Sequence, residues 1–136
     1  MKGIVDTGFV VAFARSNDRY HEWAVDLAKG ITEPLLTCEA VLAEAAFRLE
    51  SSSYVLSLVE DEMLRLAFDA SRQMPQLQEL ARRYDDRKPD FADLCLIRMS
   101  ELYPKHTVIT VDEIDFRVYR RNKRETIPLI CPPRSN

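Results

Sequence analysis

The chain has little glycine, no long apolar run and no excess of positive charge. Only three of its 136 residues are glycine, which excludes a glycine-rich loop of the kind that holds nucleotide phosphates. No apolar stretch approaches the roughly 20 residues that a membrane-spanning helix requires. The first 15 residues lack a basic start followed by a cleavable apolar segment. We therefore expect a cytoplasmic protein that does not enter a membrane.

Cysteine and histidine are also scarce. Cys38, Cys95 and Cys131 are too far apart for a CxxC metal site or a disulfide framework, so we expect buried or partly buried thiols. No Ser-His-Asp or Cys-His spacing typical of nucleophilic catalysis stands out. The formal net charge of -3 disfavours a broadly basic surface for nucleic acid, but it allows a substrate phosphate to be met through a metal ion.

What the chain does contain is an alternation of short apolar strands and helices. With 46% hydrophobic and 30% charged residues, it has the composition of a globular protein, and its length fits one domain over residues 1–136. The patterns predict strands at 2–5, 33–38, 63–68, 106–112 and 127–131. They predict helices at 9–13, 22–29, 39–50, 51–60, 75–84 and 91–102. This alternation favours a parallel sheet between helical layers.

Two of the predicted strands end at an aspartate. Asp6 follows the first strand within "IVDTGFVVAF", and Asp112 follows "VITV". In a parallel sheet, the carboxyl ends of the strands open onto the same edge, and ligands bind beyond that edge. The two carboxylates can therefore meet although more than 100 residues separate them in the sequence.

Two helical carboxylates are candidates for the same edge. Glu44, in "EAVLAEAAF", lies beside the apolar stripe of its helix, and its alanine neighbours leave room for an ion and a substrate. Asp93, in "PDFADLCLI", lies in the first turn of a largely apolar helix, one turn after Asp90.

Each of these acids also has an ordinary structural interpretation. Asp90 can be a helix cap, Glu44 a boundary residue, and Asp6 or Asp112 a turn residue at a strand end. Gathered at one edge, however, four carboxylates would repel one another and raise one another's pKa values unless a cation neutralised them. Oxygen-only ligands select Mg²⁺ or Mn²⁺, and such a site suits the hydrolysis of a phosphodiester.

In the order and spacing of its motifs, the chain resembles the PIN-domain ribonucleases, a family that includes the VapC-type toxins of bacterial toxin–antitoxin pairs. The resemblance covers essentially the whole chain. Each motif is weakly specific by itself, and the signal comes from their order. The motifs are "IVDTGFVVAF", "DRYHEWA", "EAVLAEAAF", "DFADLCLI" and "VITVDEIDF".

The resemblance implies a roughly five-stranded parallel sheet in a three-layer α/β/α sandwich, with RNA as the substrate. It also implies that four catalytic acids hold Mg²⁺ or Mn²⁺, namely Asp6, Glu44, Asp93 and Asp112. The candidate supporting residues around them are Thr7, Asp90, Thr110 and Asp115. His21 becomes a packing and hydrogen-bonding residue at a helix start.

The chain departs from the family pattern at two positions. Gly8 stands where serine or asparagine is common, which removes one polar contact from the loop. Asp90 stands where a small polar residue is frequent, which adds negative charge beside the site. Neither difference removes one of the four acids.

A basic stretch, "RVYRRNKR", follows Asp112 and has two interpretations. It is either a solvated helix face or a guide for the RNA backbone near the acidic edge. The candidates for backbone contact are Arg117, Arg120, Arg121, Lys123 and Arg124. Helices over residues 39–60 offer a candidate groove for a partner's helix, and for a VapC-type toxin this partner would be an antitoxin. From the resemblance alone we expect a homodimer.

Two other functions fit parts of the pattern. A PIN-like module that binds nucleic acid or protein with little or no nuclease activity is disfavoured because all four acids are retained. A receiver-type signalling domain also gathers acids at strand ends, but it requires a lysine after a late strand, and "IPLICPP" contains none. A metal-dependent endoribonuclease is therefore the leading hypothesis.

Overall fold

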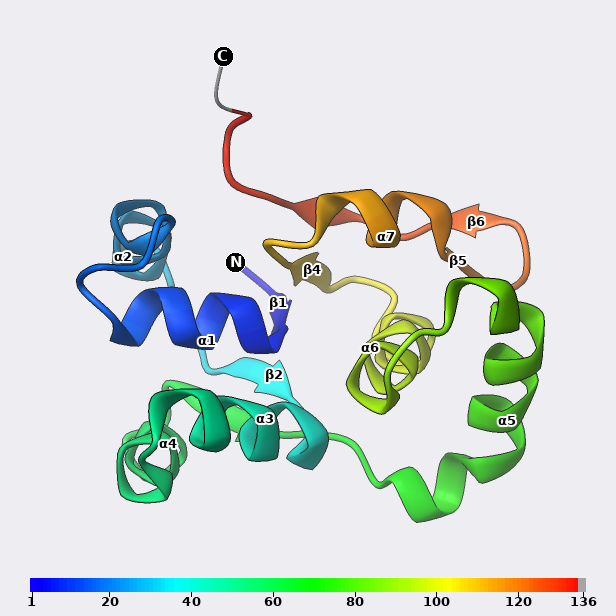
Figure 1. Ribbon diagram of the computed structural model, residues 1–136, viewed down its shortest axis with the longest axis horizontal. Coiled ribbons are helices and arrows are strands. Elements are labelled where there is room, and N and C mark those ends of the chain that lie inside the picture. Colours follow the sequence, from blue (N-terminus) through cyan, green and yellow to red (C-terminus); the bar gives the residue numbers. More distant parts are fainter. Residues whose placement is uncertain (135–136) are drawn as a thin grey trace.

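A parallel sheet lies at the centre of the fold. In the computed structural model, which describes residues 1–134, this sheet has five strands in the order β3-β2-β1-β4-β7 (Figure 1). The strands are β1 (Gly3–Val5), β2 (Leu35–Thr37), β3 (Leu64–Leu66), β4 (Thr107–Ile109) and β7 (Leu129–Ile130). Residues 135–136, the end of the predicted domain, lie outside the described part. If the five strands of this sheet are numbered 1 to 5 along the chain, their order is 3-2-1-4-5. Receiver-type domains have the order 2-1-3-4-5, so the topology of this sheet excludes that alternative.

The helices form two groups that cover the two faces of the sheet (Figure 1). In one group α1 packs on α2 and α3, and α3 packs on α4; in the other, α5 packs on α6, which lies against β1 and β4. Their bounds are α1 (Thr7–Ala14), α2 (His21–Lys29), α3 (Glu39–Leu49), α4 (Ser52–Glu60), α5 (Met74–Arg83), α6 (Phe91–Leu102) and α7 (Glu113–Val118). The predicted α/β fold is confirmed. None of these helices, which lie within residues 1–134, combines the length and apolar character that crossing a membrane requires.

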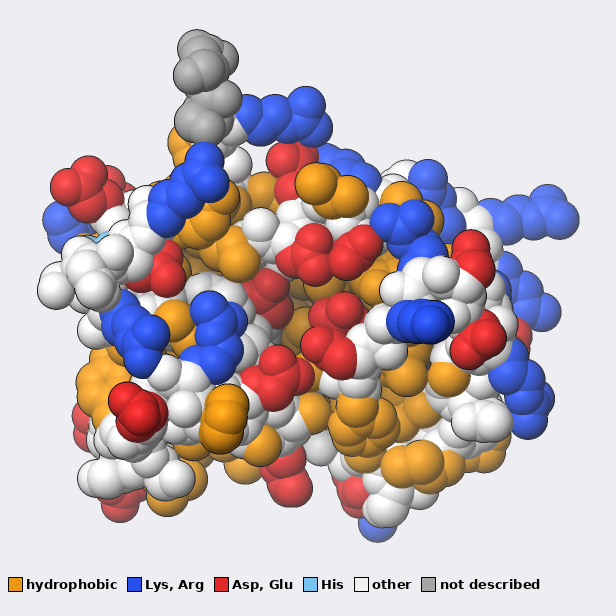
Figure 2. All heavy atoms as spheres, in the orientation of Figure 1, with side chains coloured by type: hydrophobic (Ala, Val, Ile, Leu, Met, Phe, Trp, Pro, Cys, Tyr) orange, Lys and Arg blue, Asp and Glu red, His pale blue; other side chains and the backbone are white. Residues whose placement is uncertain are grey.

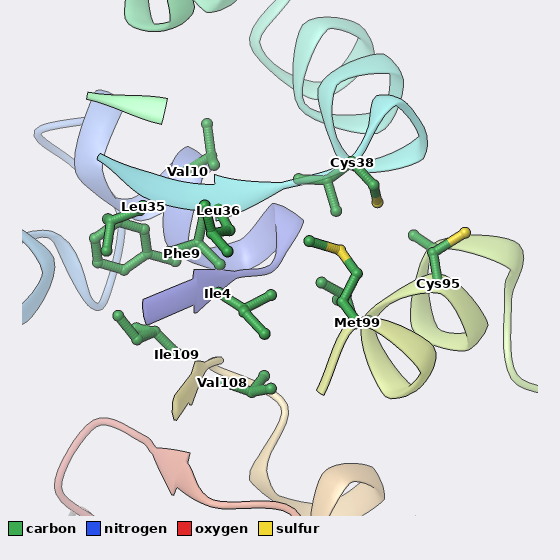
Figure 3. Packing of buried hydrophobic residues seen from close by; sticks show 14 of the residues in the cluster. Ile4, Phe9, Val10, Leu35, Leu36, Cys38, Cys95, Met99, Val108 and Ile109 are labelled. Atoms are coloured by element: carbon green, nitrogen blue, oxygen red, sulfur yellow. The ribbon is translucent and has the colours of Figure 1, made fainter. Parts of the chain in front are cut away.

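The central strands are apolar on both faces. Ile4 and Val108, which pair in register, point toward Met99 of α6, whereas Ile109 points to the other side, where Phe9 of α1 lies (Figure 3). All five side chains are fully buried. A strand that is covered on both faces has a short, continuous apolar run in its sequence. Such runs predicted the strands of this sheet. The packed strands fix the edge at which Asp6 and Thr110 leave the sheet.

The structure contains α7 and an antiparallel hairpin, β5 (Arg120–Arg121) with β6 (Glu125–Thr126), which the sequence patterns did not predict. The hairpin turn places Asn122 and Lys123 at positive φ values of 49° and 72°. Asparagine tolerates this conformation better than most residues. Elements this short span too few residues to show a hydrophobic period.

Candidate metal centre

Asp6 lies where β1 ends and α1 begins. Its Oδ1 caps α1 by accepting a hydrogen bond from the backbone N–H of Phe9 at 2.8 Å. Its Oδ2 accepts a hydrogen bond from the hydroxyl of Thr110. The side chain is buried, with the residue 7% exposed, and burial raises its pKa to about 6 despite these hydrogen bonds. The carboxylate is held in one orientation but lacks compensating positive charge.

Thr110 links the carboxyl ends of β1 and β4. It is fully buried, and besides donating to Asp6, its Oγ1 accepts a hydrogen bond from the backbone N–H of Asp112 at 2.9 Å. Asp112 in turn caps α7, because its Oδ1 accepts a hydrogen bond from the backbone N–H of Asp115 at 3.3 Å. Burial raises the pKa of Asp112. The structure thus brings the two strand-end aspartates to one place.

Asp93 lies in the first turn of α6 and faces the other acids. Its backbone N–H donates to Oδ1 of Asp90, the helix cap, at 2.8 Å. Burial, followed by the negative charges of Asp90, Asp112, Asp6 and Asp115, raises the pKa of Asp93 to about 8. The carboxyl group of Asp93 therefore lies close enough to four other acids for their charges to affect its protonation.

Glu44 reaches the cluster from α3. The side chain is half-buried, and burial followed by the negative charge of Asp90 raises its pKa. A hydrogen bond from the side chain of Thr7 partly offsets this rise. Thr7 is the first residue of α1, which packs on α3. Because Thr7 directly follows Asp6 in the chain, this hydrogen bond holds Glu44 near Asp6.

The cluster has the chemistry of a site for a hard divalent cation. Its donors are oxygens, and the pKa values of all four predicted acids are raised, as expected where negative charge is gathered with too little positive charge nearby. Figure 2 shows acidic side chains gathered in the middle of one face, in the region of α3, α6 and α7 (Figure 1). Within residues 1–134, no three His, Cys, Asp or Glu side chains converge in a preformed metal cage. Mg²⁺ does not require such a cage, because it keeps several waters and binds through one or two carboxylates together with substrate phosphates.

Asp115 already has a cationic neighbour. Its Oδ1 lies 2.9 Å from Nη2 of Arg87, which belongs to the short 3₁₀ helix η2 (Asp85–Arg87). The stretch "RRYDDRK" (82–88), which contains Arg87, is a weaker candidate guide for RNA, but no local pattern joins it to Asp115, 28 residues further on. The ion pair brings positive charge to the rim of the acidic cluster.

The structure corrects the interpretation of Arg121. This residue is only 6% exposed, and its Nη1 donates to the carbonyl oxygens of Ser100 at 2.9 Å and Pro104 at 3.3 Å. These carbonyls lie near the carboxyl end of α6, whereas Asp93 lies at its start. Arg121 therefore holds the hairpin to α6, and the prediction that it contacts an RNA backbone is corrected.

Three other residues of the basic stretch lie at the end of α7 and in the hairpin. The guanidinium of Arg120 donates to the carbonyl oxygens of Arg117 and Tyr119 at 2.7 and 3.1 Å, where α7 ends. Lys123 and Arg124 lie in the exposed turn of the hairpin, whose first strand packs on α6. The side chain of Arg120 thus caps the carboxyl end of α7. A contact of Lys123 or Arg124 with RNA stays a prediction.

A different set of arginines borders the acidic cluster. A hollow of about 640 Å³ is lined by Asp112 together with Arg19, Arg117 and Arg134. Arg117 and Arg134 both pair with Glu113, at 3.0 and 3.3 Å, and both side chains are largely exposed. Of these three arginines, only Arg117 was predicted to contact RNA. Arg19 and Arg134 come from segments that no local pattern connects to Asp112.

Gly8 and His21 have structural reasons for their positions. A Cβ atom on Gly8 would lie 2.2 Å from Cγ2 of Val111, so the close approach of α1 to the segment after β4 requires glycine there. Nδ1 of His21 lies 2.8 Å from the carbonyl oxygen of Ala12 and joins α2 to α1. His21 thus has the hydrogen-bonding role that was predicted for it.

The fold and the acidic cluster together define a PIN domain. The family model of the PIN domain matches residues 3–122, so the chain belongs to this family. Among solved structures, the chain is similar to the Mycobacterium tuberculosis toxin VapC20, described as cleaving the Sarcin-Ricin loop. The two share 19% sequence identity with a TM-score of 0.68, over 77% of this chain and 85% of that one. No curated protein sequence matches the chain.

Proposed function

We propose that this PIN domain is a metal-dependent endoribonuclease that hydrolyses RNA phosphodiester bonds, as the toxin of a toxin–antitoxin pair. The observation that carries the proposal is the position of Asp93. Its carboxyl group interacts with Asp6, Asp112 and two further acids at the carboxyl edge of a parallel sheet. Membership of the PIN family and the fold shared with VapC20 support it.

The four acids would hold Mg²⁺ or Mn²⁺: Asp6, Glu44, Asp93 and Asp112. When bound, such an ion supplies positive charge to the phosphate and lowers the pKa of water. Asp6 contributes a carboxylate that Phe9 and Thr110 hold in one orientation. A carboxylate of the cluster accepts the proton of the attacking water.

Arginines at the border of the cluster would bind the RNA backbone. Arg19, Arg117 and Arg134 line the hollow beside Asp112, and Arg87 lies on Asp115. The pairs of Arg117 and Arg134 with Glu113 are exposed, and exposed pairs contribute little free energy. A phosphate can therefore replace Glu113 as their partner at little cost.

The proposal includes a cytoplasmic protein that forms a homodimer and binds an antitoxin. Large apolar side chains stand exposed on α3 and α4, which were predicted to bind a partner helix. They are Phe47, Tyr54 and Leu56, with exposed fractions of 85%, 37% and 57%. Exposed apolar residues of this size are typical of protein contact surfaces when they are contiguous. Size-exclusion chromatography with light scattering would test the dimer.

Cleavage of RNA by the purified protein tests the enzymatic part. Wild type should cut RNA with Mg²⁺ or Mn²⁺ and stop when a chelator is added. Asp93→Asn should abolish cleavage, because it removes a charge from the cluster. Asp61→Asn is the matched control. Asp61 is an exposed aspartate that precedes β3, so it lies at the amino ends of the parallel strands, whereas the acidic cluster lies at their carboxyl ends. Full activity of Asp93→Asn, or of wild type in the chelator, would overturn the proposal.

The alternative is a PIN-like binding module without nuclease activity. Calorimetric titration with Mn²⁺ separates the two functions, because a pure binding module requires no metal site. Binding of Mn²⁺ by wild type and its loss in Asp6→Asn would favour the nuclease.

A further inference from the structure

A second hollow opens at the same edge of the sheet as the acidic cluster. It measures about 730 Å³ and lies between the first turn of α3, the segment 66–71 that follows β3, and the first turn of α6. Ligand pockets have volumes in this range, and in parallel sheets they lie beyond the carboxyl ends of the strands. Here those strands are β2 and β3, next to β1, which carries Asp6.

The hollow is continuous with the acidic cluster through two helices. Ala40 lines the hollow, and Glu44 lies one turn later on the same face of α3. Phe91 lines it from the start of α6, directly after Asp90 and two residues before Asp93. A substrate whose phosphate lies at the acids has this hollow immediately beside it.

Two phenylalanines give the hollow an aromatic lining. Phe91 is 49% exposed although it follows the cap of a helix that is otherwise largely buried. Phe68, half-buried, lines the hollow from the segment after β3. Aromatic side chains next to a phosphate site are the groups on which unpaired nucleobases stack.

The charged groups of the hollow are acidic. Glu39 and Asp69 line it, and among the described lining residues there is no lysine or arginine. Asp69 is already engaged: its Oδ1 accepts hydrogen bonds from the backbone N–H and the hydroxyl of Ser71, and its Oδ2 lies 3.5 Å from Nε of Arg72. Within residues 1–134, the exposed carboxylate of Glu39 has no hydrogen-bond partner. The carboxylate of Glu39 therefore disfavours a phosphate and can accept hydrogen bonds from amino groups.

The arginine-lined hollow beside Asp112 has the opposite character. One side of the acidic cluster thus offers guanidinium groups for the RNA backbone, and the other offers aromatic rings and carboxylate oxygens. We propose that the hollow at Phe91 binds the nucleobase adjacent to the scissile phosphate and favours cytosine, adenine or guanine, which carry exocyclic amino groups, over uracil. This assignment rests on the proposed ribonuclease function.

Glu39 and Phe91 have separate roles in this subsite. The ring of Phe91 stacks on the base without regard to its identity, because every base has a π face. The carboxylate of Glu39 accepts a hydrogen bond from an amino group such as N4 of cytosine, and uracil offers no such donor. Loss of the ring should weaken binding of all RNAs, whereas loss of the carboxylate charge should change the preference among bases.

The test uses short single-stranded RNAs that differ at one base beside the cleaved bond. Phe91→Ala should raise KM at least tenfold with little change in Mn²⁺ affinity, and Phe91→Tyr should restore KM. Leu102→Ala is the matched control, because Leu102 is 39% exposed at the other end of α6 and lies outside the lining of the hollow. Glu39→Gln should reduce the preference for cytosine over uracil by at least tenfold, since an amide both donates and accepts.

A binding measurement tests the base subsite independently of the proposed nuclease activity. RNA that carries 2-aminopurine is titrated into the cleavage-impaired variant Asp93→Asn, and stacking on Phe91 should quench its fluorescence. Quenching that is lost in Asp93→Asn/Phe91→Ala, but kept in Asp93→Asn/Leu102→Ala, supports the subsite even if wild type cleaves no RNA. Equal quenching or equal KM for the Phe91→Ala and Leu102→Ala proteins overturns it, as does RNA that does not bind.

Discussion

The hydroxyl of Thr110 donates a hydrogen bond to the carboxylate of Asp6, across 104 residues of sequence. The same oxygen accepts from the backbone N–H of Asp112, so one buried threonine ties together the ends of two neighbouring strands. Two aspartates of the proposed metal centre depend on this side chain for their positions.

Thr110→Val should destabilise the protein and weaken Mn²⁺ binding. The variant leaves a carboxylate oxygen of Asp6 and the N–H of Asp112 without their partner, which costs about 1–3 kcal/mol of unfolding free energy. The hydrogen bond from Thr110 lowers the pKa of Asp6, so without it Asp6 holds its proton to higher pH and competes less well for metal. Chemical denaturation and calorimetry measure the two effects. Thr110→Ser keeps the hydroxyl and should retain most of the metal affinity; equal loss in both variants would contradict the explanation.

The acidic cluster should make the metal-free protein less stable as the pH rises. The pKa of Asp93 is 3.8 in the unfolded chain and about 8 in the folded protein, so between these values the folded state holds the proton more tightly. The free energy of unfolding therefore falls from about pH 4 to about pH 8.

The asparagine side chain of the Asp93→Asn variant cannot ionise, so its free energy of unfolding should not fall in this way as the pH rises. At pH 8 with a chelator, its free energy of unfolding should exceed that of wild type by about 1–2 kcal/mol, and the difference should vanish near pH 4. Urea denaturation at both pH values measures it. Asp61→Asn should show no such pH-dependent gain, and a gain of equal size in that control would refute the role of clustering.

Gly8→Ala should be destabilising because of Val111. The added Cβ meets Cγ2 of Val111 at 2.2 Å, and overpacking of this kind costs about 1–3 kcal/mol. The double variant Gly8→Ala/Val111→Ala removes the clashing group and should recover much of the loss, as thermal denaturation of the three variants would show. A double variant that is as unstable as the sum of the single changes would mean that the strain lies elsewhere.

Substitution of Arg121 should affect stability, whereas substitution of Arg117 should affect RNA binding. Arg121→Leu leaves the carbonyl oxygens of Ser100 and Pro104 without their donor, and should lower the free energy of unfolding by about 1–3 kcal/mol. RNA affinity of the folded variant should be unchanged. Arg117→Ala should instead weaken RNA binding and reduce its salt dependence by about one counterion, with little effect on stability. Filter binding at several salt concentrations measures the contrast, and an unchanged salt slope in Arg117→Ala would remove Arg117 from the RNA path.

The positions of the strands in the chain, the parallel sheet and the choice of the acids could be predicted from the sequence. Apolar runs at 2–5 and 106–112 predicted the strands that became β1 and β4, although both strands are shorter in the structure, at Gly3–Val5 and Thr107–Ile109. Carboxylates at strand ends and in first helical turns could be selected because parallel strands share one carboxyl edge. The proposed metal centre follows from these local patterns together with the order of the family motifs.

The roles of the basic residues were decided only by the tertiary structure. Arg121 and Arg117 lie four residues apart in one basic run, yet one is buried against α6 and the other is exposed beside Asp112. Arg19 and Arg134 lie in distant segments and meet at the same hollow. Apolar periodicity and helix capping act between near neighbours, so the sequence by itself determined the strands of the sheet, the helices α1 to α6, the sheet edge and its acids. Which charge is buried, which is paired and which faces a substrate depends on contacts between distant segments, and only the packed fold sets those contacts.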